Sequence, residues 1–120
     1  MARKAVISLT TGLEDIEKVT VALLVAVGAA ETGNETLVFL TQEAVRLALP
    51  GVAAGVGCTG CPPLESLVER YRVAGGRWFV CPICVDARGI DASTLIDGAE
   101  LNGTIPMWTW IGDGATTFSY

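Results

Sequence analysis

The chain has 120 residues, of which 51% are hydrophobic and 18% charged, and its formal net charge is −5. This length is typical of one domain with its own core, so we expect a single domain over residues 1–120. The acidic balance and the dispersed basic residues exclude binding to a nucleic-acid backbone, which needs clustered lysine and arginine.

Neither a membrane span nor a secretory signal is expected. The longest apolar run, residues 19–30, is shorter than the roughly 20 residues that a helix needs to cross a bilayer. The apolar stretch near the start gives way at once to polar and acidic residues, unlike a signal peptide. We therefore expect a cytoplasmic protein whose thiols stay reduced. Its surplus of apolar residues predicts a homo-oligomer, because a small interior cannot hold them all.

The first half of the chain alternates strand and helix patterns. Residues 4–9 form a short apolar run rich in β-branched residues, which predicts a buried strand. A long helix is expected over residues 13–32, with acidic residues in its first turns, where the helix dipole favours them. A second strand is expected over residues 36–40. Thr41 then caps a predicted helix that runs to about Leu49.

The second half continues the alternation. Residues 51–60 are rich in glycine and alanine and predict a loop. A helix is expected over residues 64–73, opened by two prolines, which a first helical turn tolerates. A third strand follows over residues 77–80, and then a short helix over residues 82–88. The last predicted elements are a strand at residues 99–101, a helix at 105–111 and a strand at 115–119.

This alternation predicts an α/β fold: a three-layer sandwich with a mostly parallel five-stranded sheet and helices on both faces. Ligands of such sheets bind at the carboxyl ends of the strands. Three loops leave those ends, and they begin at Thr10, Thr41 and Cys81.

All four cysteines lie in two C-x-x-C pairs, and the chain has no histidine. Catalysis by serine or cysteine with a histidine base is therefore excluded, as is a zinc site with imidazole ligands. Cys81 follows the third strand, and Pro82 suits the first position of the next helix, so Cys81 is expected to cap that helix. Helix N-termini and C-x-x-C contexts lower the pKa of a thiol. Cys84 is then placed as a resolving thiol or a second ligand.

The second pair, Cys58 and Cys61, lies in the glycine-rich loop. That loop must return the chain to the carboxyl edge of the sheet, so both pairs are expected to converge there. The linear spacing C-x₂-C-x₁₉-C-x₂-C also matches a four-thiolate zinc site. The residues leave three interpretations open: zinc or an iron–sulfur cluster held by all four thiolates, a dithiol/disulfide redox protein, or a sulfur carrier with a persulfide on one cysteine.

The segment Val80-Cys81-Pro82-Ile83-Cys84-Val85-Asp86-Ala87-Arg88-Gly89-Ile90, followed by Leu95-Ile96-Asp97-Gly98, resembles the DsrE/DsrF-like sulfur-relay family. The likeness is greatest to its small YchN-type members and extends over nearly the whole chain.

The resemblance implies a trimer or hexamer of parallel-sheet subunits, with sulfur donor and acceptor proteins as partners. It further implies that the cysteine eight residues before the glycine of the Arg-Gly pair, here Cys81, accepts sulfane sulfur as a persulfide in a sulfurtransferase or carrier role. Cys84 matches the second cysteine of the YchN-type members, whereas Cys58 and Cys61 have no counterpart. Arg88 could lend positive charge to the site. Thr10, Thr11 and Gly12 could donate hydrogen bonds to an anionic sulfur group, although a simple turn explains them equally well.

Overall fold

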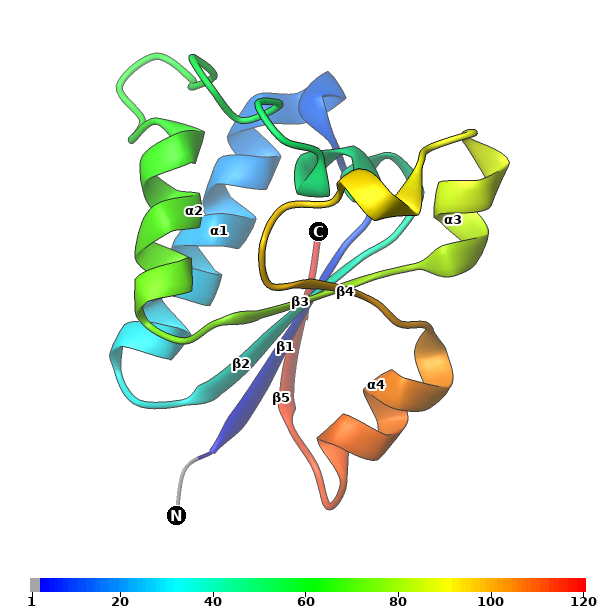
Figure 1. Cartoon of the computed structure of the whole chain (residues 1–120). Coiled ribbons are helices and arrows are strands. Elements are labelled where there is room, and N and C mark those ends of the chain that lie inside the picture. The colour runs from blue at the N-terminus through cyan, green and yellow to red at the C-terminus, as the bar shows by residue number, and fades with distance from the viewer. Residues whose placement is uncertain (1–2) are drawn as a thin grey trace.

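The computed structural model describes residues 3–120 and confirms the α/β fold (Figure 1). Five strands form one sheet in the order β4-β3-β2-β1-β5, and every strand pair is parallel, not only most of them. The strands are β1 (Lys4–Leu9), β2 (Glu35–Leu40), β3 (Arg77–Val80), β4 (Ala99–Leu101) and β5 (Thr116–Ser119). The α-helices are α1 (Ile16–Glu31), α2 (Leu64–Val73), α3 (Pro82–Ala87) and α4 (Thr104–Ile111). Three 3₁₀ helices are η1 (Leu13–Asp15), η2 (Gln42–Ala48) and η3 (Ala92–Thr94).

Alternating side chains of the central strands feed two separate cores, which explains why helices lie on both faces. On β1, Ile7 and Leu9 pack into the larger core together with α1 and α2. Val6, one residue before Ile7, points to the other face and joins a smaller core that includes Ile111 of α4. Figure 1 shows α1 and α2 on one side of the sheet and α4 on the other. The period-two alternation of each strand therefore sorts its apolar residues between the two layers.

Two predicted helices differ from the structure. The helix expected over residues 13–32 is split into η1 and α1, because the Asp15 side chain accepts a hydrogen bond from the Lys18 amide at 3.0 Å and caps a new helix there. The prediction that Thr41 caps an α-helix was wrong: its side chain makes no capping hydrogen bond, and η2 is a 3₁₀ helix. The amide of Ala44 lies within hydrogen-bonding distance of the carbonyls of Thr10 and Thr41, which ties this turn to the loop after β1.

No helix in residues 3–120 is long and apolar enough to span a membrane.

Candidate functional site

The loops that follow β1, β2 and β3 lie together at the carboxyl edge of the sheet. The amide of Thr41 donates to the carbonyl of Leu9, and the amide of Cys81 donates to the carbonyl of Leu40, both at 3.0 Å. Gly12 approaches the second loop so closely that a Cβ on it would lie 2.8 Å from the Glu43 carbonyl oxygen. The three strands are neighbours in the sheet, so their carboxyl ends form one continuous edge.

Cys81 lies at this edge, directly after β3, and is the N-cap residue of α3. Pro82 occupies the first helical turn, and the Val85 amide donates to the Cys81 carbonyl at 3.1 Å, which starts the helix. Cys81 and Cys84 are both free thiols and both half-buried. Cys81 packs against the rims of both cores, so its sulfur lies where the two layers meet.

The pKa of the Cys81 thiol is raised, whereas the sequence predicted that it would be lowered. Burial of the sulfur is the largest cause, and it outweighs the backbone N–H groups of Cys84 and Ile83, which lower the pKa. The neighbouring thiol of Cys84 raises it further. With six residues, α3 offers few aligned peptide dipoles to counter the burial.

Arg88, at the end of α3, contacts the site through the backbone. Its Nη1 donates to the carbonyl of Cys84 at 3.2 Å, and its Nε forms a short hydrogen bond to the carboxylate of Glu43 on η2. Glu43 is also paired with Arg46 at 3.0 Å, and the hydrogen bonds from Arg88 and then Arg46 lower its pKa. The charge of Arg88 is therefore largely matched by a carboxylate, and its main effect is to join α3 to η2.

The polar groups of the first loop are directed at the protein. The hydroxyl of Thr10 donates to the carbonyl of Tyr120 at 3.0 Å, and the amide of Gly12 donates to the Glu14 carboxylate at 2.8 Å. Thr11 is half-buried. In this structure the two donors therefore hold the edge of the sheet together, which is the simple-turn interpretation of these residues.

The second cysteine pair lies apart from the first. Cys58 and Cys61 form a disulfide in the loop between η2 and α2, which runs over the ends of α1 and α2 on the far side of the molecule from α3 (Figure 1). Within residues 3–120 no three cysteine or acidic side chains are grouped as metal ligands would be. The expected convergence of the two pairs is thus not seen, and a four-thiolate zinc or iron–sulfur site does not fit this arrangement.

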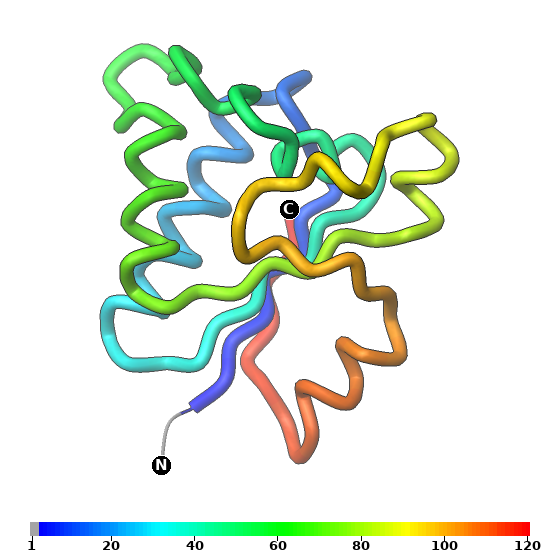
Figure 2. Tube along the Cα trace, viewed as in Figure 1, coloured from blue at the N-terminus to red at the C-terminus, as the bar shows by residue number. Residues whose placement is uncertain are grey.

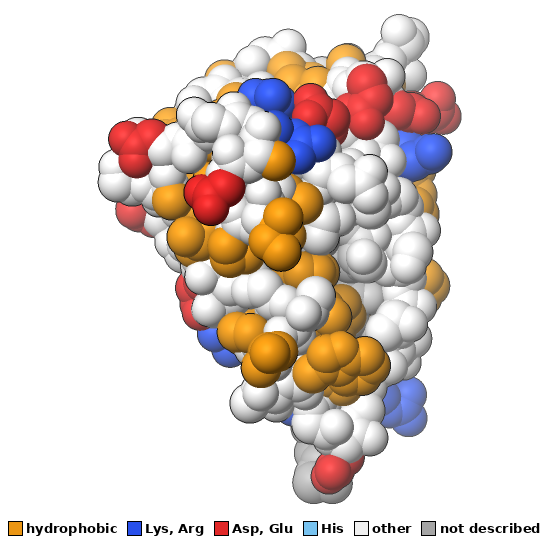
Figure 3. Space-filling model, turned by 90° about the vertical axis from the view of Figure 1, so that its right-hand side faces the viewer, with side chains coloured by type: hydrophobic (Ala, Val, Ile, Leu, Met, Phe, Trp, Pro, Cys, Tyr) orange, Lys and Arg blue, Asp and Glu red, His pale blue; other side chains and the backbone are white. Residues whose placement is uncertain are grey.

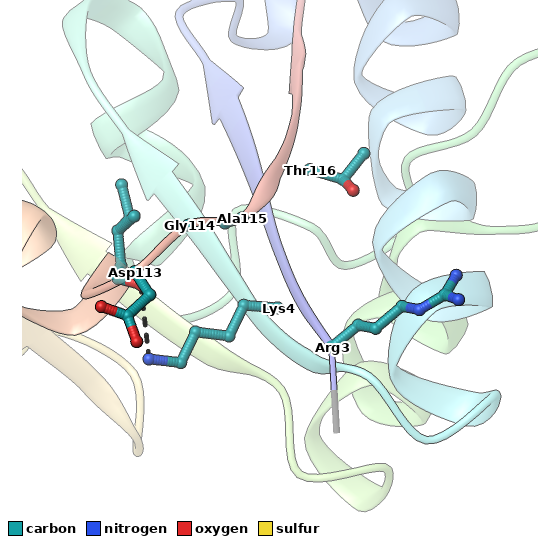
Figure 4. Close-up of a pocket in the computed structure, with 7 residues that line it drawn as sticks. Arg3, Lys4, Asp113, Gly114, Ala115 and Thr116 are labelled. Atoms are coloured by element: carbon teal, nitrogen blue, oxygen red, sulfur yellow. Dashed lines mark hydrogen bonds between the residues drawn. The ribbon is translucent and has the colours of Figure 1, made fainter. Parts of the chain in front are cut away.

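A cavity of about 450 Å³ lies at the opposite, amino end of the sheet, between β1 and the start of β5 (Figure 4). Lys4 lines it, and its ammonium group donates to the carbonyls of Trp110 and Ile111, which capping of the α4 C-terminus explains. Ligands of parallel sheets bind at the carboxyl ends of the strands, so the Cys81 edge, and not this cavity, is the candidate functional site.

Two residues of this edge were missed by sequence reasoning. Glu43 is the partner of Arg88 across 45 positions of the chain, and no spacing rule connects them. Gln42 adopts a left-handed backbone conformation, with φ of 53°, at the first residue of η2. Such a conformation is strained for a residue with a Cβ and often accompanies functional sites. Nothing in the residue type signals it.

Comparison with known proteins identifies relatives of this chain. Protein YchN of Escherichia coli strain K12 is 29% identical over 98 residues, which make up 80% of each chain. Protein MJ0760 of Methanocaldococcus jannaschii is 30% identical over 94 residues, which are 78% of this chain but 34% of that protein. The chain thus spans about a third of the MJ0760 length.

Solved structures support the same fold. The crystal structure of YchN from E. coli has a TM-score of 0.80 at 21% identity, and the match covers both chains completely. Protein MTH1491 from Methanobacterium thermoautotrophicum has a TM-score of 0.69 at 12% identity, over 98% of this chain and 99% of that chain. The model of the DsrE/DsrF-like family matches residues 3–120. The chain therefore belongs to the DsrE/DsrF-like family.

Proposed function

We propose that this protein is a cytoplasmic sulfur carrier that holds sulfane sulfur as a persulfide on Cys81. One observation carries the proposal: Cys81 is a free, half-buried thiol at the carboxyl edge of a DsrE/DsrF-like sheet and at the N-terminus of α3, where the backbone N–H groups of Ile83 and Cys84 act to lower its pKa. Backbone donors of this kind stabilise negative charge on sulfur without a histidine, which the chain lacks.

The transfer step is a thiol–persulfide exchange. The Cys81 thiolate attacks the terminal sulfur of a donor persulfide, and a new S–S bond forms on Cys81. The S–S bond of the donor breaks, and the donor leaves as a thiolate that takes up the proton lost from Cys81. Attack by an acceptor thiolate on the outer sulfur of Cys81 repeats the exchange and regenerates the Cys81 thiolate.

Cys84 gives the persulfide a second outcome. Its thiolate can attack the Cys81 sulfur, which forms a Cys81–Cys84 disulfide and releases the outer sulfur as hydrosulfide. The two cysteines lie three residues apart at the start of α3, and Cys84 raises the pKa of Cys81, which supports this resolution step. Arg88 acts as a positioning residue, since it fixes the Cys84 carbonyl relative to η2.

The test is mass spectrometry of protein incubated with an inorganic polysulfide and then freed of excess donor. We expect an adduct of one sulfur atom on the peptide that contains Cys81. Cys81→Ser should abolish it, and Cys84→Ser should make it longer-lived, because the resolving thiol is gone. A Cys58→Ser/Cys61→Ser double variant is the control and should load normally. An adduct that survives Cys81→Ser would overturn the assignment.

We also propose that the chain assembles as a homo-oligomer, a trimer or hexamer. Exposed apolar side chains gather on the face that carries α3 and α4 (Figure 3). They include Ile83, within the Cys81-Cys84 segment, and Trp108 on α4, whose side chains are 79% and 66% exposed. A second copy on this face would cover apolar surface beside the reactive thiols.

A further inference from the structure

The loop between η2 and α2 holds a second sulfur centre that the carrier function does not use. Cys58 and Cys61 are joined by a disulfide, with Cα atoms 5.1 Å apart, and neither belongs to a helix or strand. Figure 2 shows the loop crossing over the start of α1, on the side of the molecule away from α3. We propose that Cys58–Cys61 is a reversible dithiol/disulfide centre, which exchanges two electrons with an external dithiol and is independent of Cys81.

A purely structural role explains this disulfide poorly. It links residues only three apart in sequence, and the entropic stabilisation from a disulfide grows with the length of the loop that it closes. The turn is already closed by a backbone hydrogen bond of 3.0 Å from the Cys61 amide to the Cys58 carbonyl. Gly60, with φ of 78°, supplies the left-handed conformation that such a turn needs. The disulfide therefore pins no distant elements together.

The two sulfurs have different surroundings, which suits an ordered exchange. Cys58 Sγ lies 3.8 Å from Oγ1 of Thr20 on α1, in a part-buried contact, whereas Cys61 Sγ lies 3.9 Å from the carbonyl oxygen of the exposed Thr59. Both cysteines are half-buried, and because Cys58 Sγ is the sulfur in contact with α1, we place the attack of an incoming thiolate on Cys61. The thiolate bonds to Cys61 Sγ, the Cys58–Cys61 bond breaks, and the electron pair leaves on Cys58 Sγ. The second thiolate of the dithiol then releases Cys61, and two protons complete the reduced pair.

Thr20 accommodates the reduced state. Its side chain is 1% exposed, and its hydroxyl donates to the Ile16 carbonyl at 2.7 Å, which leaves its oxygen lone pairs free to accept. The protonated Cys58 thiol can donate to that oxygen from its present position. The contact favours the dithiol over the disulfide, since a disulfide sulfur has no proton to give. The reduced state thus finds a hydrogen-bond partner without rearrangement of α1.

The test uses a Cys81→Ser/Cys84→Ser background, so that only the second pair reports. The folded protein is equilibrated in mixtures of reduced and oxidised dithiothreitol and quenched with a mass-tagged maleimide, while near-ultraviolet circular dichroism follows folding. We expect two thiols to appear together and reversibly while the fold persists. Thr20→Val should require a severalfold higher ratio of reduced to oxidised dithiothreitol at the midpoint, and Thr20→Ser should restore the original midpoint. A disulfide reduced only on unfolding, or two thiols that never pair, would overturn the proposal.

Single-cysteine variants in the same background test the order of attack. When Cys58→Ser leaves Cys61 alone, we expect faster reaction with a small aromatic disulfide than when Cys61→Ser leaves Cys58 alone. Equal or reversed rates would show that Cys61 is not the attacked sulfur.

Discussion

At the scale of the residue, the pKa of the Cys81 thiol is determined by neighbouring groups with opposite effects. Burial and the thiol of Cys84 raise its pKa, and two backbone N–H groups lower it. A raised pKa keeps more of the thiol protonated at neutral pH, so the thiolate that attacks sulfane sulfur becomes more abundant as the pH rises. We therefore expect sulfur loading to accelerate with increasing pH over the range where the protein stays folded.

Replacement of the neighbouring thiol tests this balance. Cys84→Ser removes a group that ionises nearby and leaves a hydroxyl that can donate to the Cys81 thiolate. It should therefore lower the pKa of Cys81 and move half-maximal alkylation by iodoacetamide to lower pH, which can be followed on the Cys81 peptide by mass spectrometry. An unchanged or upward-shifted midpoint would contradict the role given to Cys84. In the absence of reductant, Cys58 and Cys61 stay in their disulfide and are not alkylated, so the label reports on Cys81 and Cys84 alone.

The position of Cys81 could be predicted from sequence because its neighbours are strongly constrained. A buried strand ends before it, and Pro82 is tolerated only at the start of a helix. The raised pKa of Cys81 could not be predicted. It results from burial against two cores, and no pattern in the sequence near Cys81 indicates that it contacts both of them. The Arg88–Glu43 pair was equally hidden, since it depends on how η2 folds against the loop after β1.

At the scale of the element, the join between α2 and β3 depends on one close approach. Tyr71 is fully buried on α2, its ring packs edge-on against Trp78 of β3 with centroids 4.8 Å apart, and its hydroxyl bonds the Arg77 carbonyl at 2.7 Å. A Cβ on Gly76 would lie 2.2 Å from that ring. The residue between helix and strand must therefore be glycine for steric reasons.

Gly76→Ala should destabilise the fold by about 1–3 kcal/mol or more, because the aromatic ring is held on all sides and cannot yield. Urea unfolding gives the measurement. The matched control is Gly28→Ala in the last turn of α1, where nothing lies within 4 Å of the added Cβ. That change should stabilise the protein by roughly 0.5–1 kcal/mol, since alanine favours a helix. If both variants lose stability equally, the steric explanation fails.

The elements that were predicted well from the sequence are those whose type and bounds are determined by their own hydrophobic pattern. Residues 4–9, 64–73 and 77–80 match β1, α2 and β3 because each is bounded by turn residues and has one clear period. The region after β2 was predicted as a helix because Thr41 could cap it and Pro50-Gly51 could end it. Its actual 3₁₀ form follows from contacts with the loop after β1, which no local pattern records.

At the scale of the whole molecule, the two faces of the sheet are covered unequally. Two long helices cover one face, while the eight-residue α4 covers the other and leaves Ile105 and Trp108 78% and 66% exposed. The outer side of β5 is also exposed along its whole length. Apolar surface of this kind on one side of a small domain is typical of an interface between subunits.

Two charge substitutions, one on each face of the molecule, should show whether a loss of assembly is specific to the α3–α4 face. Trp108→Glu puts a carboxylate in the proposed contact between copies, where its desolvation would oppose association. Native mass spectrometry should then show the 12.5 kDa monomer in place of a trimer or hexamer. Val73→Glu on α2 is the control, because Val73 is equally exposed, at 71%, but lies on the opposite face, and it should leave the assembly intact. A monomeric parent protein, or dissociation by both variants, would contradict the α3–α4 face as the interface.

If Trp108→Glu also changes the alkylation rate of Cys81, the partner subunit contributes to the environment of the reactive thiol. The exposure of Ile83, two residues from Cys81 in the chain, leads us to expect this result.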